Sequence, residues 1–365
     1  MGTNTRVAGI NTIFWHSHGT GIGVSYRSMR LLDLIAQGRG AHILSDDGRE
    51  LPGANLFSTT LQNCPLRYVL TDELARCATH LAFAEGDRLS ACLDLIRVPA
   101  QALWVEWAEA PRRVALLSIP SLEVKDQAPA RHGGALITAA ADGRSGCLRS
   151  FWSALDDRAY LSPIVTHFDL DRQPVLPPPA DPTLWRGETR LNMDGEPAIE
   201  ELLEHLRFHF DEEWAKYYHA RCRTDALRAS VLRSSLGGCV FDAPMLMALF
   251  LLFGARDLLP RQEVRHERLN RIRHQGGKPP FLEHIEVSAP LDRPPTRLRE
   301  VADQPISERL SPRLHHVRGH IVRRGASVFW RSPHLRGSSR LGQVRSRTVH
   351  LTFGASAVEL AQTYH

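Results

Sequence analysis

The sequence predicts an α+β protein, with an N-terminal mixed sheet-and-helix region, a central helical region and a small antiparallel β-module at the C-terminus. Three observations predict this class. Short β-favouring runs alternate with an amphipathic segment in the first half, apolar residues recur at helical spacing in the centre, and a period of two appears near the end. Proline-rich stretches separate the three parts, as expected of extended linkers.

A chain of 365 residues is long enough for two or three domains. The composition shifts set the predicted boundaries. They give an α+β domain over residues 1–171, a Pro-rich linker over 172–196, a helical region over 197–260, a basic helix with a GGKPP loop over 261–288, a second linker over 289–310, and a basic antiparallel β-module over 311–365.

The N-terminal region contains runs of β-branched and aromatic residues that predict strands. These runs lie at residues 11–15, 66–71, 102–107, 113–119 and 134–140. Between the second and third runs, apolar residues of segment 72–96 recur every three or four positions, which predicts an amphipathic helix or helix pair. Thr71 or Asp72 is the expected cap of this helix.

The central region has the strongest helical pattern of the chain, over residues 197–235. Pro197 suits a first turn, and an apolar stripe from Ile199 to Trp214 follows helical spacing. We expect the Gly-Gly pair at 237–238 to end this helix. The apolar run 243–255 predicts a buried core helix, because it falls short of the roughly 20 residues that a bilayer requires.

Residues 261–282 predict a short basic helix that breaks at GGKPP and places its arginines on one face. The arginines in question are Arg261, Arg265, Arg268 and Arg271. After residue 311 the period becomes two, which predicts a strand over 314–323, a glycine turn at 324–326 and a return strand. A third strand is expected at 347–353, giving a sheet with one apolar face and one face rich in Arg and His.

The overall composition excludes several classes of protein. With 43% hydrophobic and 23% charged residues, wholesale disorder is excluded. The six cysteines form no C-x-x-C pair, which argues against a zinc knuckle or a secreted disulfide scaffold and fits a reducing compartment. The N-terminus has no sustained apolar segment of a signal peptide. We therefore expect a cytoplasmic protein that has no membrane partner, no cofactor and no metal.

The positive charge is concentrated near the C-terminus. Residues 261–350 hold 19 Lys and Arg against 8 Asp and Glu, whereas residues 1–260 hold 26 against 31. Eighteen of those 19 bases are arginine, whose planar fork matches phosphate and stacks on flat rings. A basic surface with an exposed aromatic ring suits phosphate binding and base stacking, so nucleic acid, either DNA or RNA, is the expected partner.

The expected nucleic-acid-binding residues share a basic or aromatic side chain and lie in two segments. They are Arg313, His315, Arg318, His320, Arg323, Arg324, Trp330, Arg331, His334 and Arg336 in the β-module, and Arg265, Arg268 and Lys278 before it. Trp330 is the expected stacking platform.

Three alternatives stay open for this basic module. Its charged face can dock onto the acidic residues of segment 200–213 of the same chain, or it can bind an acidic host protein. His316 and His320 can also act as general base and general acid of a metal-independent nuclease. At four residues apart on one strand they lie roughly 13 Å apart, too far to hold one metal ion. The protein is therefore expected to be a binding protein more than an enzyme.

Three further motifs carry weaker hypotheses. The stretch HSHGTGIG, residues 16–23, fits a turn or a metal or phosphate site. Glu106 lies between two tryptophans, so it is either on the solvated side of a strand or a carboxyl group with a raised pKa. His205 and His209 have the spacing of zincin ligands, but Leu206 replaces the required Glu, so an exposed helix face is expected.

The run Leu269-Asn270-x-x-Arg273, followed by Gly277-Lys278-Pro279-Pro280 and later by Arg313-x-His315-x-x-Arg318-Gly319-His320, resembles uncharacterised phage and prophage proteins. The segment LWVEW around Glu106 also resembles a tryptophan–glutamate strand of those proteins. The resemblance covers about 100 residues of the C-terminal third. It implies a phage or prophage origin and action inside a bacterium, and it implies no particular activity.

Overall fold

The structure, a computed structural model, describes residues 29–45, 48, 50–119, 130–153, 155–175, 200–255, 258–289, 313–317, 320–325, 327–331, 334–336 and 338–343. The chain forms two compact units, one of Met1–Pro290 with Arg323–Phe329, the other of Leu291–Val322 with Trp330–His365. The expected strands at 11–15 and 347–353, the HSHGTGIG motif, Arg318 and most of both linkers lie outside the described residues.

The first unit is built around an eight-stranded mixed sheet in the order β6-β5-β4-β3-β2-β1-β8-β7. Its strands are β1 Leu66–Leu70, β2 Ala102–Ala108, β3 His132–Ala139, β4 Ser145–Ser153, β5 Ala159–Asp169, β6 Leu206–Phe210, β7 Arg261–Val264 and β8 His284–Val287. β1 runs parallel to both β2 and β8, and the other neighbours are antiparallel. This sheet and its helices confirm the α+β class.

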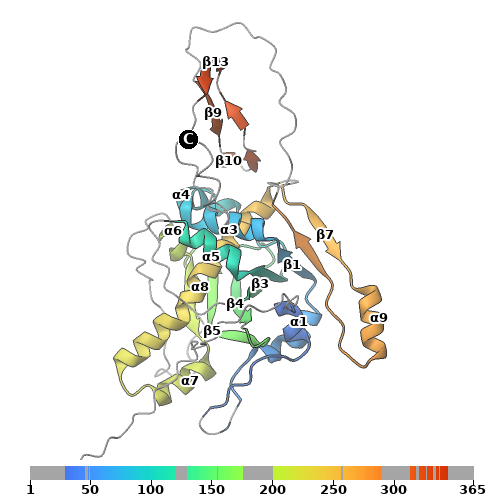
Figure 1. The fold of residues 1–365 in the computed structure, drawn as a ribbon. Helices are drawn as coiled ribbons and strands as arrows, with labels where there is room; N and C mark the ends of the chain where they lie inside the picture. The colour runs from blue at the N-terminus through green and yellow to red at the C-terminus, as the bar shows by residue number, and fades with distance from the viewer. Residues whose placement is uncertain are drawn as a thin grey trace, which may run out of the picture. The chain divides into compact units, whose positions relative to one another are not determined.

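Helices cover both faces of this sheet (Figure 1). They are α1 Leu31–Ala36, α2 Ser58–Gln62, α3 Asp72–Ala84, α4 Gly86–Ser90, α5 Glu109–Leu117, α6 Glu200–Glu204, α7 Glu212–Arg221, α8 Asp225–Gly254 and α9 Glu267–Gln275, with 3-10 turns η1 Ala54–Phe57 and η2 Leu93–Leu95. On one face, α3, α5 and α8 pack together, and Tyr68 of β1 lies 4.9 Å from Phe253 of α8. On the other face, Trp104 and Phe151 bury against Leu31 of α1.

Several predicted elements are confirmed. The runs at 66–71, 102–107 and 134–140 form β1, β2 and β3, and segment 72–96 forms α3, α4 and η2. Thr71 caps α3, since its hydroxyl accepts a hydrogen bond from the Leu74 amide at 3.5 Å. The predicted strand at 113–119 is wrong, because most of it belongs to α5. The buried positions Pro111, Arg112, Ala115 and Leu116 recur at helical spacing in that helix.

The predicted continuous helix over 197–235 is also wrong. Its middle, β6, pairs antiparallel with β5 and buries Phe208 and Phe210. Tertiary pairing on the sheet edge therefore overrides the helical spacing of the apolar residues. The chain then turns into α7, whose cap Asp211 accepts from the Glu213 amide at 3.2 Å.

α8 continues through the Gly-Gly pair that was expected to end a helix, and through Pro244. It includes the apolar run 243–255 up to Gly254, and that run is buried as predicted. By length and composition α8 can cross a membrane, but 78% of its most apolar window is buried inside the fold. Such burial is typical of a core helix.

The basic helix predicted over 261–282 is shorter than expected. Residues 261–264 form β7, and the helix α9 begins only at Glu267, so Arg261 and Arg265 do not share a helical face with Arg268. β7 and β8 close one edge of the large sheet, and β6 closes the other. The segments 206–210 and 261–287 thus belong to the same sheet as the N-terminal strands.

Five short strands lie near the C-terminus: β9 Arg313–Val317, β10 His320–Arg324, β11 Ser327–Arg331, β12 His334–Arg336 and β13 Ser338–Gln343. They form a two-stranded sheet β10-β11 and a three-stranded sheet β12-β9-β13. β9 runs antiparallel to β12 but parallel to β13, so the prediction of a wholly antiparallel module is wrong. The hairpin turn at Gly325, where φ is 56°, is confirmed. The single strand expected over 314–323 is wrong, because β9 and β10 are separate strands in different sheets. His316 and His320 therefore do not share a strand.

Candidate nucleic-acid interface and two cavities

The basic arm, defined here as residues 261–283, contains β7, α9 and the loop that returns to β8. β7 forms the edge of the large sheet, and α9 lies away from α3, α5 and α8 (Figure 1). α9 has no buried residue, and Leu269 and Ile272 are 44% and 57% exposed. A helix that buries none of its faces needs other contacts to keep it in place.

A clasp between α9 and the loop supplies those contacts. The Asn270 side chain donates to the Phe281 carbonyl at 2.9 Å and accepts from the Phe281 amide at 2.8 Å. Arg273 donates to the Pro279 carbonyl at 2.7 Å, and its guanidinium lies 4.1 Å from the Phe281 ring centre. Gly277 adopts φ 64°, a left-handed conformation that suits glycine. These motif residues hold the arm in shape.

The clasp leaves other cations of the arm exposed. Arg268, Arg271 and Lys278 are exposed, and no hydrogen bond or ion pair joins their side chains to any described residue. Arg265 donates to Glu263 at 2.7 Å, but both side chains are more than half exposed. Arg261 instead lies over the rings of Tyr68 and Phe253. Arg265, Arg268 and Lys278 are thus all exposed on the arm.

The C-terminal strands carry most of the other expected binding residues. The described strand register pairs His315 with Arg336 and Val317 with His334, so these positions lie on one side of the three-stranded sheet. Arg313 is two residues from His315 on β9 and lies on the same side. His320 and Arg324 lie on β10, and Trp330 and Arg331 on β11.

Arg323 forms an ion pair that the sequence did not predict. Its guanidinium forks onto Asp94, with Nη1 and Nη2 each 2.8 Å from a carboxylate oxygen, and also donates to the Ala91 carbonyl. This contact joins Arg323 to Asp94 and not to the acidic residues of segment 200–213 that the internal-docking alternative named. Both side chains stay partly exposed, at 38% and 59%.

A strand-end cavity of about 380 Å³ opens where β1 and β2 end, beside β8. Its lining includes Arg30, Thr71, Asp72, Glu106, His132 and Glu286. In the parallel ladder, Val69 is the partner of both Glu106 and Glu286, so these two residues flank it on one face of the sheet. The sheet brings together charged residues from segments far apart in the sequence.

Glu106 forms the base of this cavity and is 1% exposed. Its two carboxylate oxygens accept hydrogen bonds from the Leu31 and Leu32 amides of α1 at 2.8 and 2.9 Å, and Trp104 donates at 3.3 Å. Burial raises the pKa of Glu106, although these hydrogen bonds oppose the shift. The expectation of a solvated strand face is wrong, and the side chain instead anchors the start of α1.

Two further titratable side chains lie beside α1. Burial raises the pKa of Asp33 to about 6, and its carboxylate accepts from the Leu282 amide at 3.0 Å. Burial, with Arg30 nearby, lowers the pKa of His284 to about 4. His284 Nδ1 lies 3.1 Å from Arg30 Nη1 and 3.2 Å from the Leu282 carbonyl oxygen, so the tautomer decides whether it accepts from Arg30 or donates to Leu282. The buried Nε2 of His284 has no partner among the described residues.

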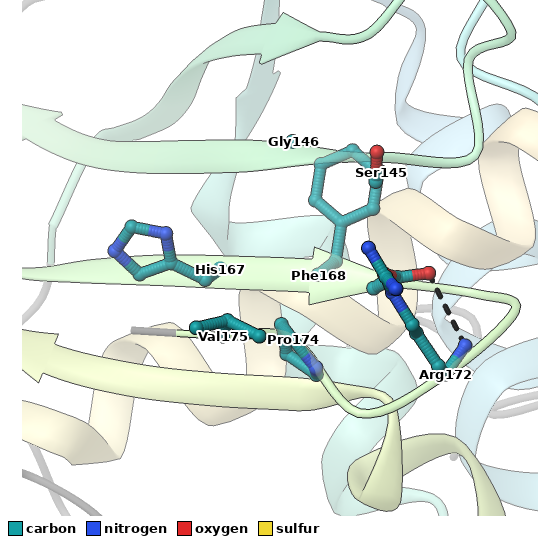
Figure 2. A pocket seen from close by; sticks show the side chains of 8 residues that line it. Ser145, Gly146, His167, Phe168, Arg172, Pro174 and Val175 are labelled. Carbon is teal, nitrogen blue, oxygen red and sulfur yellow. Dashed lines mark hydrogen bonds and ion pairs between the residues drawn. The ribbon is translucent and has the colours of Figure 1, made fainter. Parts of the chain in front are cut away.

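A second cavity of about 220 Å³ lies between the start of β4 and the end of β5. Figure 2 shows Phe168 reaching toward Ser145 and Gly146 of β4, and Arg172 at the mouth in its 3.0 Å ion pair with Asp169. Burial lowers the pKa of His167 to about 4, with added repulsion from His209 and Arg149. The cavity is shallow and its charged residues are already paired.

The zincin-like histidines are separated by the break before β6. His205 bonds the Asp169 carbonyl at 2.8 Å, and His209 is buried on β6 beside His167, with ring centres 6.1 Å apart. The exposed helix face expected for them is wrong. Within the described part of the chain, no group of three His, Cys, Asp or Glu side chains is arranged to hold a metal ion.

Comparisons with protein-family models, with curated proteins and with solved structures find no match to this chain. The sites above therefore rest on geometry alone. Sequence patterns identified Glu106 but missed Arg30, His132 and Glu286. No local pattern marks these residues, because pairing of β2 with β1 and β3, and of β1 with β8, brings them together.

Proposed function

We propose that this protein binds nucleic acid through its basic arm and its C-terminal strands, acting on backbone phosphates with little sequence preference. The observation that carries the proposal is the exposed set Arg268, Arg271 and Lys278, on an arm that the clasp holds in a fixed shape. An arm whose backbone is already held in one conformation loses less conformational entropy on binding than a flexible arm.

The three-stranded sheet supports the same proposal. Arg313, His315, His334 and Arg336 lie on one side of it by register, which concentrates donors for phosphate oxygens. Trp330 remains the proposed stacking platform for a base. By the resemblance of its motifs, the proposed setting is the cytoplasm of a bacterium that carries a phage or prophage, with the C-terminal β-module as a binding unit.

Salt dependence gives the test its first readout. Each phosphate neutralised on duplex DNA adds about −0.9 to the slope of log affinity against log salt. Three to four neutralised phosphates therefore give a slope of roughly −3 to −4. We expect such a slope from fluorescence anisotropy of the full chain with labelled duplex and single-stranded oligonucleotides between low and moderate salt.

Variants give the second readout. The triple variant Arg268→Ala, Arg271→Ala, Lys278→Ala should lower affinity and reduce the steepness of the slope by about 2 to 3. The matched control removes three exposed arginines elsewhere, as Arg39→Ala, Arg158→Ala, Arg172→Ala, and should keep most of the slope. A flat salt response of the wild type, or equal losses in both variants, would contradict the proposal.

The same titrations discriminate the alternatives. An acidic host protein as the partner predicts no binding of either oligonucleotide at low salt. A metal-independent nuclease predicts that wild type shortens the labelled strand in the presence of a chelator, and that His316→Ala or His320→Ala stops cleavage while binding persists. Intact oligonucleotide after long incubation with wild type removes that alternative.

A further inference from the structure

The strand-end cavity contains charged side chains of both signs, and the protein itself satisfies several of them. Glu106 accepts from the amides of α1. Glu73, also on the cavity wall, accepts from Arg76 at 3.0 Å, and His132 shares a 3.2 Å hydrogen bond with Ser153. These groups need no ligand to complete their hydrogen bonding.

Two partly buried charged side chains form no ion pair with a described residue. The Arg30 guanidinium lies near enough to the carboxylates of Glu106 and Asp33 to lower their pKa values, but its one hydrogen-bond contact among the described residues is the ring of His284. Glu286, on β8, has no hydrogen bond or ion pair with any described residue. Both line the same cavity, yet no ion pair joins them. Asp72 adds an exposed carboxylate at the wall.

Arg30 and Glu286 line one cavity but form no ion pair with each other. A bound group of opposite charge would stabilise each of these partly buried charges. A ligand that carries an anionic and a cationic group can supply both missing partners at once. A simple anion would meet repulsion from Glu286 and Asp72, and a simple cation would leave the Arg30 guanidinium without a hydrogen-bonded carboxylate, because Glu106 and Asp33 bond backbone amides instead. We propose that the strand-end cavity binds a small zwitterion of the α-amino acid class.

In this arrangement the ligand carboxylate pairs with Arg30, where the guanidinium fork can hold both oxygens. The ligand ammonium group donates to Glu286, with Asp72 as a second acceptor. The site lies outside the carboxyl ends of parallel strands, the usual place for ligands in such sheets. Its volume also falls in the range of small-molecule pockets.

The test uses the full chain and a panel of the twenty L-α-amino acids, screened by thermal shift and confirmed by isothermal titration calorimetry. Acetate serves as the carboxylate-only probe and ethylamine as the amine-only probe. We expect at least one amino acid to bind about 10- to 100-fold more tightly than either probe, since each lacks one charged contact.

Variants then assign the two contacts. Glu286→Gln keeps the side-chain shape and should weaken binding of that amino acid about tenfold or more, and Arg30→Lys should do so by loss of the fork. Arg172→Ala, at the second cavity, is the matched control and should bind normally. Circular dichroism and unchanged unfolding midpoints show that each variant is folded.

Three results would overturn the inference: no amino acid binds at millimolar concentration, acetate or ethylamine binds as tightly, or both folded cavity variants bind like wild type. Nucleic-acid binding is independent of these outcomes, because the basic arm contributes no residue to the cavity.

Discussion

Replacing Asp33 by asparagine should make the free energy of unfolding less dependent on pH. Asp33 is 4% exposed in the first turn of α1, and burial raises its pKa from 3.8 to about 6. The folded state therefore binds the proton more tightly than the unfolded state between these two pKa values. As pH rises through this window, the wild type loses stability, because a buried carboxyl must ionise.

The magnitude follows from the shift. One pKa unit corresponds to 1.36 kcal/mol, so a shift from 3.8 to about 6 corresponds to about 3 kcal/mol of lost stability above pH 6. The carboxamide of the Asp33→Asn variant cannot ionise, and its oxygen can still accept from the Leu282 amide. Part of this change falls below pH 4, so the stability difference, Asp33→Asn minus wild type, should grow by about 2 to 2.5 kcal/mol between pH 4 and pH 7.

Urea unfolding followed by tryptophan fluorescence, at half-unit steps from pH 4 to pH 8, measures this difference. Any fixed cost of the new amide group cancels, because only the change with pH is used. Asp87→Asn, at an exposed position in α4, is the control and should give a difference that stays nearly constant. A difference for Asp33→Asn that is flat within about 0.5 kcal/mol, or that falls as pH rises, would refute the reasoning.

Three other substitutions test contacts that hold the first unit together. Arg112→Met removes a buried guanidinium that bonds Glu109 at 2.8 Å and Asp242 at 2.6 Å, and should cost about 3–5 kcal/mol in urea unfolding, because two carboxylates stay buried without a cation. A loss below about 1 kcal/mol would contradict this. Glu106→Gln places an NH₂ group against a backbone N–H donor of α1 and should lower the free energy of unfolding by about 2 kcal/mol. The measurement is the thermal unfolding midpoint, which should fall. An unchanged midpoint would show that α1 does not depend on its hydrogen bonds to Glu106. Arg323→Ala breaks an exposed pair, with side chains 38% and 59% exposed, and should change stability by less than about 1 kcal/mol; a larger loss in urea would mean that this contact is not solvent-screened.

The sequence predicted the elements whose local pattern agrees with their place in the fold. β1, α3 and β2 follow one another with clear periods and a Thr71 cap, and they form a parallel unit. β4 and β5 were missed, because their sequences mix Ser, Gly, Arg and Pro with apolar residues. In such strands pairing on both sides, and not β-propensity, determines the structure.

Where the sequence failed, a long-range contact decided the structure. The sequence pattern of β6 predicts part of a helix, and only its pairing with β5 makes it a strand. Glu106 was noticed between its tryptophans, but its partners are amides some 75 residues earlier in the chain. Arg30 and His284 are 254 residues apart. No local period contains such information, so the strand-end cavity was not predictable without the sheet order.

Only some of the basic side chains of the arm are exposed and unpaired among the described residues, and this limits the number of phosphates that the arm can neutralise. Arg261 lies over rings, Arg273 belongs to the clasp and Arg323 is forked on Asp94, whereas Arg268, Arg271 and Lys278 are exposed. Three cations can neutralise at most about three phosphates, a slope of about −3. A steeper slope for the full chain therefore requires further phosphate contacts, by Arg265 of the arm or by the C-terminal strands. The slope that remains in the arm triple variant measures the share of these other cations, and a remaining slope of zero would mean that Arg268, Arg271 and Lys278 alone bind phosphate.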